Sequence, residues 1–216
     1  MQRILAIIHL VGNAGLLSMA RIIFKLLIYS SFFLTKCYGQ EKKEKYHPLA
    51  IEWNNKATVF IRFQNYDSAL FYLDKAIEVD SSLYTAYENK SSVYCTLIDY
   101  KKAVIETKRI LLIKPDLAEA WIMAGMLSDK IGDTLNALSF YRTSIEIFER
   151  RLKDPNRSKQ SEANSINRVL SLILIGKESE ARKEINRLKG LYPNNKMLGQ
   201  MLTLDKKDYL KEIFGI

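Results

Sequence analysis

The chain has 216 residues, of which 48% are hydrophobic and 26% charged, as in ordinary globular proteins with one sizeable core or a short solenoid. Only nine glycines and four prolines occur, which favours long helices and argues against a loop-rich β protein. The net charge is +9, and it falls to +5 without the first forty residues, which hold four basic side chains and no acidic one. Such a mildly basic remainder does not by itself indicate a nucleic-acid partner.

The first forty residues are predicted to be a targeting segment. Arg21 and Lys25 precede a mainly apolar stretch, residues 26–34, and residues 37–39, Cys-Tyr-Gly, have the small-x-small pattern that signal peptidases accept. Cleavage after this site leaves a mature chain that begins with a glutamine. Met19 is then a candidate for the true start of translation.

Alternatives for this segment stay open. Residues 4–17 are also mostly apolar, and residues 18–20 form a second small-x-small site. The segment is alternatively retained as a membrane anchor, although basic side chains interrupt it. Residues 34–37, Leu-Thr-Lys-Cys, are similar to the lipobox of bacterial lipoproteins, except that a lysine stands where a small residue is usual. Each alternative predicts an exported protein, in the periplasm or cell envelope.

From residue 50 onward, residues of one kind recur every 34 positions. The recurring sets are Trp53, Tyr87 and Trp121; Ala57, Ser91 and Gly125; and Ala69, Ala103 and Ala137. This pattern resembles the tetratricopeptide repeat (TPR), and its clearest copy is WIMAGMLSDKIGDTLNALSFY, residues 121–141. The resemblance implies an all-α fold, a TPR-type α-solenoid in which each repeat is a pair of antiparallel helices.

The repeat register divides the chain into eight parts. They are a signal peptide or membrane anchor (1–40), a linker (41–49), three repeats (50–83, 84–117 and 118–151), an insertion (152–161), a TPR-like fourth repeat (162–195) and a C-terminal capping helix (196–216). The third repeat has Glu149 where a proline belongs, so its second helix is predicted to run to about Lys153, with residues 154–161 as an exposed loop. An amphipathic helix over residues 196–214 is predicted to cover the open end of the stack.

Residues at the turns of the repeats have predictable roles. Asn65, Asp99 and Asp133 fall where a short polar side chain can cap the second helix. Gly132 supplies a turn conformation that other residues disfavour. Small residues such as Ala57 and Ala69 let the paired helices approach closely.

In this family the concave surface is lined mainly by the first helix of each repeat, so the resemblance implies a partner-binding groove. Its candidate residues are Asn54 and Asn89 in a polar first half, and Ile122, Met126, Ile166, Leu170 and Ile173 in an apolar second half. Residues 169–175 are apolar on nearly every side, so their groove face is expected to be covered. The cover is either the chain itself, through residues 149–161 or the C-terminal helix, or an apolar segment of a partner.

Other functions receive little support. The family's carboxylate clamp holds the acidic C-terminus of a chaperone, but of its positions, Asn54, Thr58, Asn89, Glu119 and Met123, only Asn89 matches. The basic run at residues 150–159 is interpreted as a solvated helix end and loop. Cys95 is interpreted as an idle thiol and His47 as a linker residue.

The sequence therefore predicts a non-enzymatic adaptor or assembly scaffold that binds a peptide or helix of another protein. No cofactor, metal or small-molecule substrate is expected, a nucleic-acid partner is disfavoured, and a membrane contact is expected only through residues 1–40. The alternative is a self-associating structural or membrane-tethered envelope component that uses its apolar face for oligomer contacts.

Overall fold

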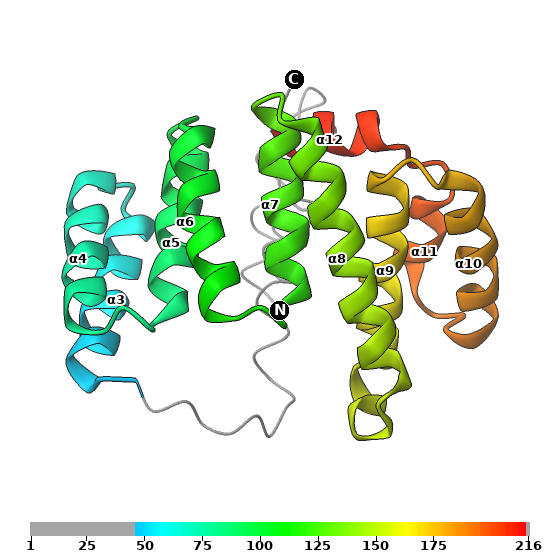
Figure 1. Cartoon of the computed structure of the whole chain (residues 1–216), viewed down its shortest axis with the longest axis horizontal. Coiled ribbons are helices and arrows are strands. Elements are labelled where there is room, and N and C mark those ends of the chain that lie inside the picture. The colour runs from blue at the N-terminus through cyan, green and yellow to red at the C-terminus, as the bar shows by residue number, and fades with distance from the viewer. Residues whose placement is uncertain (1–45, 215–216) are drawn as a thin grey trace, which may run out of the picture. The chain divides into compact units, whose positions relative to one another are not determined.

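The structure, a computed structural model, describes residues 46–214, and within this range all regular structure is helical (Figure 1). The elements are α3 (Pro48–Arg62), α4 (Tyr66–Val79), α5 (Tyr84–Thr96), α6 (Tyr100–Ile113), α7 (Ala118–Lys130), α8 (Thr134–Lys153), the 3-10 helix η2 (Pro155–Gln160), α9 (Ser161–Leu174), α10 (Glu178–Leu191), α11 (Lys196–Met201) and α12 (Lys206–Phe214). The predicted targeting segment, residues 1–40, lies outside the described residues. None of the described helices has the length and apolar character needed to span a bilayer.

Four helical hairpins follow one another in chain order: α3–α4, α5–α6, α7–α8 and α9–α10 (Figure 1). The second helix of each hairpin packs against the first helix of the next, which is the nearest-neighbour arrangement of a solenoid. These hairpins and α11 belong to one compact unit that ends at Lys206. Nearly all of α12 belongs to a separate unit.

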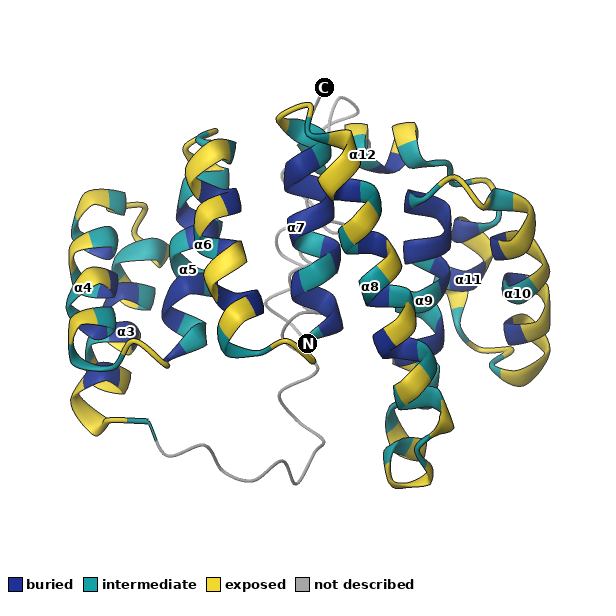
Figure 2. Ribbon diagram, in the orientation of Figure 1, coloured by how far each residue is buried: buried dark blue, intermediate teal, exposed yellow. Residues whose placement is uncertain are grey.

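The hairpins close tightly because small residues stand where their two helices meet. Ala57 of α3 and Ala69 of α4 are both completely buried. In the third hairpin the equivalent position is Gly125, which lies against the ring of the buried Tyr141. As a result α7 is buried along most of its length (Figure 2).

The predicted capping residues begin the second helix of each of the first three hairpins. The side chains of Asn65, Asp99 and Asp133 each accept a hydrogen bond from the backbone N–H three residues further on. These bonds satisfy backbone donors that lack a partner within the helix. The predicted N-caps are therefore confirmed.

The turn before each cap requires a left-handed backbone, which Gly132 adopts with a φ of 83°. In the second hairpin the same position is Ile98, with a φ of 63°, although its branched side chain is 72% exposed. A left-handed conformation costs a residue with a Cβ atom about 1–2 kcal/mol. Because the Ile98 side chain is exposed, its burial does not offset this cost.

We therefore expect Ile98→Gly to raise the free energy of unfolding by about 1 kcal/mol, since glycine adopts this conformation without strain, although it also loses entropy on folding. Urea unfolding followed by circular dichroism measures the change. The reverse substitution, Gly132→Ile, is the matched control and is expected to destabilise. A loss of stability in Ile98→Gly would show that the exposed side chain makes a stabilising contact.

The end of the third repeat was predicted to be a long second helix followed by an exposed loop, and only the helix is confirmed. Helix α8 ends at Lys153, as predicted. Residues 154–161 are not a simple loop, because Pro155–Gln160 forms η2, which leads directly into α9. The Asp154 side chain starts η2 by accepting a hydrogen bond of 2.9 Å from the Asn156 backbone, and the φ of proline suits a first helical position.

The predicted single helix over residues 196–214 is also wrong, because α11 ends at Met201 and α12 begins at Lys206. Between them, Leu202 and Leu204 both pack on the core of the last hairpin. Residues two apart lie on different faces of a straight helix, so the packing of both leucines on one core favours the break.

Candidate functional site

The fold brings together the two polar residues predicted for the groove. Asn89 of α5 donates a hydrogen bond of 2.8 Å from Nδ2 to Oδ1 of Asn54 in α3. Asn54 is nearly buried and Asn89 is half-buried. Among the described residues neither side chain has another hydrogen-bond partner, so the Asn54 amide N–H groups and the Asn89 carbonyl oxygen are left unpaired.

The apolar groove residues predicted in the third repeat are part of the core in this structure. Ile122 and Met126 of α7 are both buried. Because little of either side chain is accessible, they do not form an open docking surface as the chain stands. The accessible part of the predicted groove therefore lies mainly in the first two repeats.

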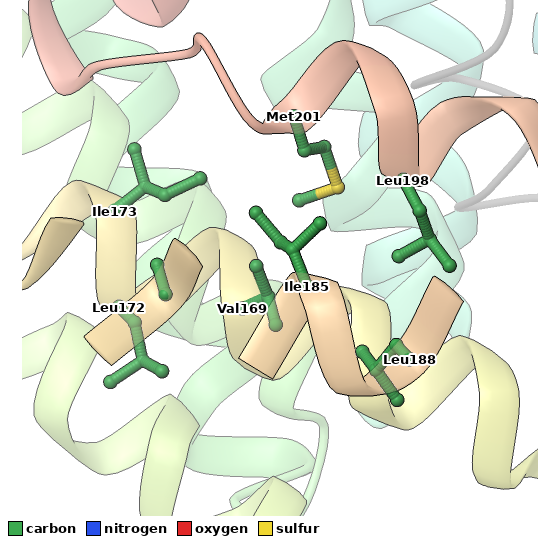
Figure 3. Close-up of a cluster of buried hydrophobic side chains, with 8 residues drawn as sticks. Val169, Leu172, Ile173, Ile185, Leu188, Leu198 and Met201 are labelled. Carbon is green, nitrogen blue, oxygen red and sulfur yellow. The ribbon is translucent and has the colours of Figure 1, made fainter. Parts of the chain in front are cut away.

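The apolar residues predicted in the fourth repeat are covered by the chain itself. Ile173 of α9 is buried in a cluster that includes Leu198 and Met201 of α11, and Ile166 and Leu170 pack against the same cluster, each half-buried. Figure 3 shows Met201 and Leu198 beside Ile185 and Leu188 of α10. In this structure the apolar face is therefore covered by the C-terminal segment of the chain itself, which is one of the two alternatives that the sequence left open.

An ion pair fastens the end of this segment to the third hairpin. Nζ of Lys206 lies 2.8 Å from Oδ2 of Asp129, at the end of α7. The same oxygen accepts a hydrogen bond of 2.8 Å from the hydroxyl of Tyr141, and the Lys206 ammonium lies over the Tyr141 ring. Asp129 is therefore well paired although its side chain is nearly buried.

A second ion pair neutralises the acidic side chain that stands at a clamp position. Glu119 of α7 accepts hydrogen bonds of 2.9 and 3.1 Å from Nη1 of Arg151, near the end of α8, with both side chains almost buried. The other nitrogen of Arg151 donates to the backbone carbonyl of Asp116. The basic run is thus only partly the solvated helix end that its composition indicated, since Arg151 ties the extension of α8 to the start of α7.

The chemistry of the remaining candidates is weak. Burial raises the pKa of the Cys95 thiol to about 11, although a hydrogen bond with the Ser91 side chain lowers this pKa by a smaller amount. Little reactive thiolate therefore forms at neutral pH. His47 caps α3, because its Nδ1 accepts a hydrogen bond from the Leu49 backbone. Within residues 46–214 no three His, Cys, Asp or Glu side chains are grouped to hold a metal ion.

The structure defines a class of protein, the α-solenoids built from helical hairpins. A sequence profile of the tetratricopeptide repeat matches residues 53–83 and 118–150. These two segments are tetratricopeptide repeats, and repeats of this family serve as protein-interaction modules. Proteins of this family and fold are generally scaffolds without enzymatic activity.

Two curated proteins are similar to parts of the chain. The heat shock protein sti1 homolog of Schizosaccharomyces pombe is 28% identical over 98 residues, which cover 45% of this chain and 17% of that protein. The mitochondrial import receptor subunit TOM70 of Saccharomyces cerevisiae is 29% identical over 136 residues, which cover 58% of this chain and 21% of that protein. The similarity thus spans about a fifth of either relative.

Two solved structures share the fold. One is YrrB, described as a TPR protein with an unusual peptide-binding site, with a TM-score of 0.50, 21% identity, and coverage of 76% of this chain and 78% of that one. The other is a tetratricopeptide repeat protein from Parabacteroides merdae, with a TM-score of 0.53, 21% identity, and coverage of 81% and 62%. At this level of identity the likeness concerns the fold.

Proposed function

We propose that this protein is an exported adaptor or assembly scaffold that binds an extended peptide segment of a partner protein across Asn54 and Asn89. The hydrogen bond between these two side chains carries the proposal. It fixes both amides and leaves one donor group and one acceptor oxygen unpaired within the described chain. A peptide group offers the complementary carbonyl and N–H.

The surroundings of the pair suit a short peptide. Ile51 and Ile61 of α3 lie three and seven residues from Asn54 and so share its helix face, and they are exposed and half-buried, respectively. They offer apolar contacts for alternate side chains of an extended peptide, while the amides hold its backbone. YrrB, which shares the fold, is described as having a peptide-binding site.

An acidic chaperone tail is not the proposed ligand. The clamp position that needs a lysine holds Glu119, and its charge is matched by Arg151, so neither side chain is available for a carboxylate. The position that needs an arginine holds Met123. The sti1 relative therefore supports a protein-interaction role for this chain without supplying its ligand.

Peptide binding is tested by selecting peptides from a displayed library on the full-length protein and measuring their affinity by fluorescence anisotropy. Asn89→Ala is expected to weaken binding about fivefold, because one hydrogen bond contributes about 1 kcal/mol. Asn55→Ala is the matched control, since Asn55 is an exposed amide on the same helix. Peptides that bind both variants like the parent protein would place the site elsewhere.

Export rests on the targeting pattern of residues 1–40 and is proposed with it. In a host that secretes the protein, the mass of the mature chain is expected to match a start at Gln40. A chain of full mass in the envelope fraction would favour a retained anchor, and a chain beginning with a lipid-modified Cys37 would favour a lipoprotein. Full-length protein in the cytoplasm alone would contradict export.

A further inference from the structure

The first described helix, α3, presents one stripe of residues that the rest of the described chain leaves exposed. Glu52, Lys56 and Val59 of α3, with Phe63 directly after the end of this helix, recur at helical spacing, and we call these four residues the end stripe. All four are exposed, and the two apolar members, Val59 and Phe63, are 47% and 80% exposed. Large apolar side chains on one helix face are a common mark of a contact surface.

In later repeats the residues equivalent to Glu52, Lys56 and Val59 are mainly buried. One repeat further on, Ala86 packs with Leu73 and Ala76 of α4, and Val93 is buried. Two repeats further on, Ala120 and Ala124 pack with Ile110 and Leu111 of α6, and Leu127 is buried. This face of a first helix is therefore the one on which another helix docks.

The docking helix supplies a carboxylate for a basic residue at the position of Lys56. In the second repeat, Nζ of Lys90 lies 2.7 Å from Oδ1 of Asp74 in α4. In the fourth, Arg168 lies 2.8 Å from Oε1 of Glu149 in α8. Lys56 has no such partner among the described residues and lies over the Tyr72 ring instead, at 4.4 Å. Whatever covers the end stripe should therefore carry an acidic residue opposite Lys56.

We propose that the end stripe is the contact surface between two copies of this chain, related by a two-fold axis. Each stripe carries its own acid, since Glu52 is exposed and has no ion pair among the described residues. Glu52 and Lys56 stand one helical turn apart, so two antiparallel copies of α3 place each Glu52 opposite Lys56 of the other copy. Val59 then loses contact with water.

The described chain argues against other covers. The residues that lead into α3 lie toward the second repeat, since Tyr46 contacts the ring of Tyr84 and the His47 backbone donates to Asp80. The last hairpin already has α11 packed on it. A head-to-tail chain of copies therefore lacks an equally open end, whereas a two-fold contact needs only the first hairpin. The contact does not involve the Asn54–Asn89 pair.

The area of the end surface determines how tightly the two copies are expected to bind. Helices of 15 and 14 residues, each about 10 Å wide and roughly 21 Å long, present a face on the order of 400 Å² in projection. A standard interface buries about 800 Å² from each partner. We therefore expect a reversible dimer in the micromolar range, observed by sedimentation velocity of the full-length protein over a concentration series.

Charge reversal tests the geometry. Glu52→Lys alone and Lys56→Glu alone are each expected to raise the dimer Kd about tenfold or more, because a two-fold axis repeats each repulsion twice. The double variant Glu52→Lys/Lys56→Glu restores opposite charges in both pairs and is expected to return within about threefold of the parent Kd. Failure of the double variant to recover would overturn the two-fold pairing.

Val59→Ser tests the apolar part and is expected to raise the dimer Kd about tenfold or more. Ile105→Ser is its matched control, because Ile105 is exposed to a similar degree but lies on α6, away from the stripe. The control is expected to dimerise like the parent. A parent protein that is monomeric at every concentration, or a dimer unaffected by Val59→Ser, would overturn the proposal. A stable one-to-one complex in which a helix of another protein binds the end stripe would also overturn the proposal.

Discussion

Replacing Gly125 with alanine is expected to lower the free energy of unfolding by about 2–3 kcal/mol and the melting temperature by about 6–10 °C. A Cβ atom at this position would clash with Cε1 of Tyr141 and would lie within 3 Å of two further ring atoms. The ring has little freedom to move, because it is completely buried and its hydroxyl donates to Asp129. Thermal unfolding followed by circular dichroism measures the effect.

Gly190 provides a control of opposite sign. It also lies within a helix, but a Cβ atom there would meet no other atom within 4 Å. Gly190→Ala is therefore expected to stabilise the chain by up to about 1 kcal/mol, through helix propensity alone. If Gly125→Ala proved as harmless as Gly190→Ala, the close packing of α7 on α8 would be wrong.

Replacing Arg151 with methionine is expected to lower the free energy of unfolding by about 2–4 kcal/mol. The substitution leaves the Glu119 carboxylate without its cation. This carboxylate is almost buried, since the side chain of Glu119 is only 8% exposed and that of Arg151 only 12%. It also removes the donor to the Asp116 carbonyl at the loop between α6 and α7. Urea unfolding at fixed salt gives the difference.

Two further variants separate charge from packing. Glu119→Gln/Arg151→Met leaves no buried charge and is expected to recover at least half of the lost stability. Arg150→Met removes the neighbouring ion pair with Asp116, whose side chains are 66% and 81% exposed, and is expected to cost less than about 0.5 kcal/mol. Equal losses for Arg150→Met and Arg151→Met would contradict the distinction between them.

Much of this fold was predictable, because the repeat places residues with strong local requirements at fixed intervals. The caps at Asn65, Asp99 and Asp133 and the left-handed turn at Gly132 follow from local backbone chemistry alone. The extension of α8 followed from a missing proline and the later Asp154-Pro155 pair. Ile98 was not predictable, because the stack imposes a backbone conformation that its side chain disfavours.

The candidate site was less predictable, because it depends on which segments cover one another. The repeat register placed Asn54 and Asn89 on neighbouring helices, and these residues do meet. It also marked Ile173 as a groove residue, but only the tertiary structure places Leu198 and Met201 over it. The pairing of Glu119 with Arg151 joins residues about one repeat apart, and no local signal indicates it.

The ion pair between Lys206 and Asp129 has a consequence for how the chain folds. Most hairpin contacts join residues within one repeat or in adjacent repeats, so their loops close quickly and helical pairs can form in any order. Lys206 and Asp129 are separated by more than two repeats, and the loop between them closes at a greater entropic cost. Lys206 therefore has no partner until α7 is in place, and the end of the C-terminal segment is expected to be ordered last.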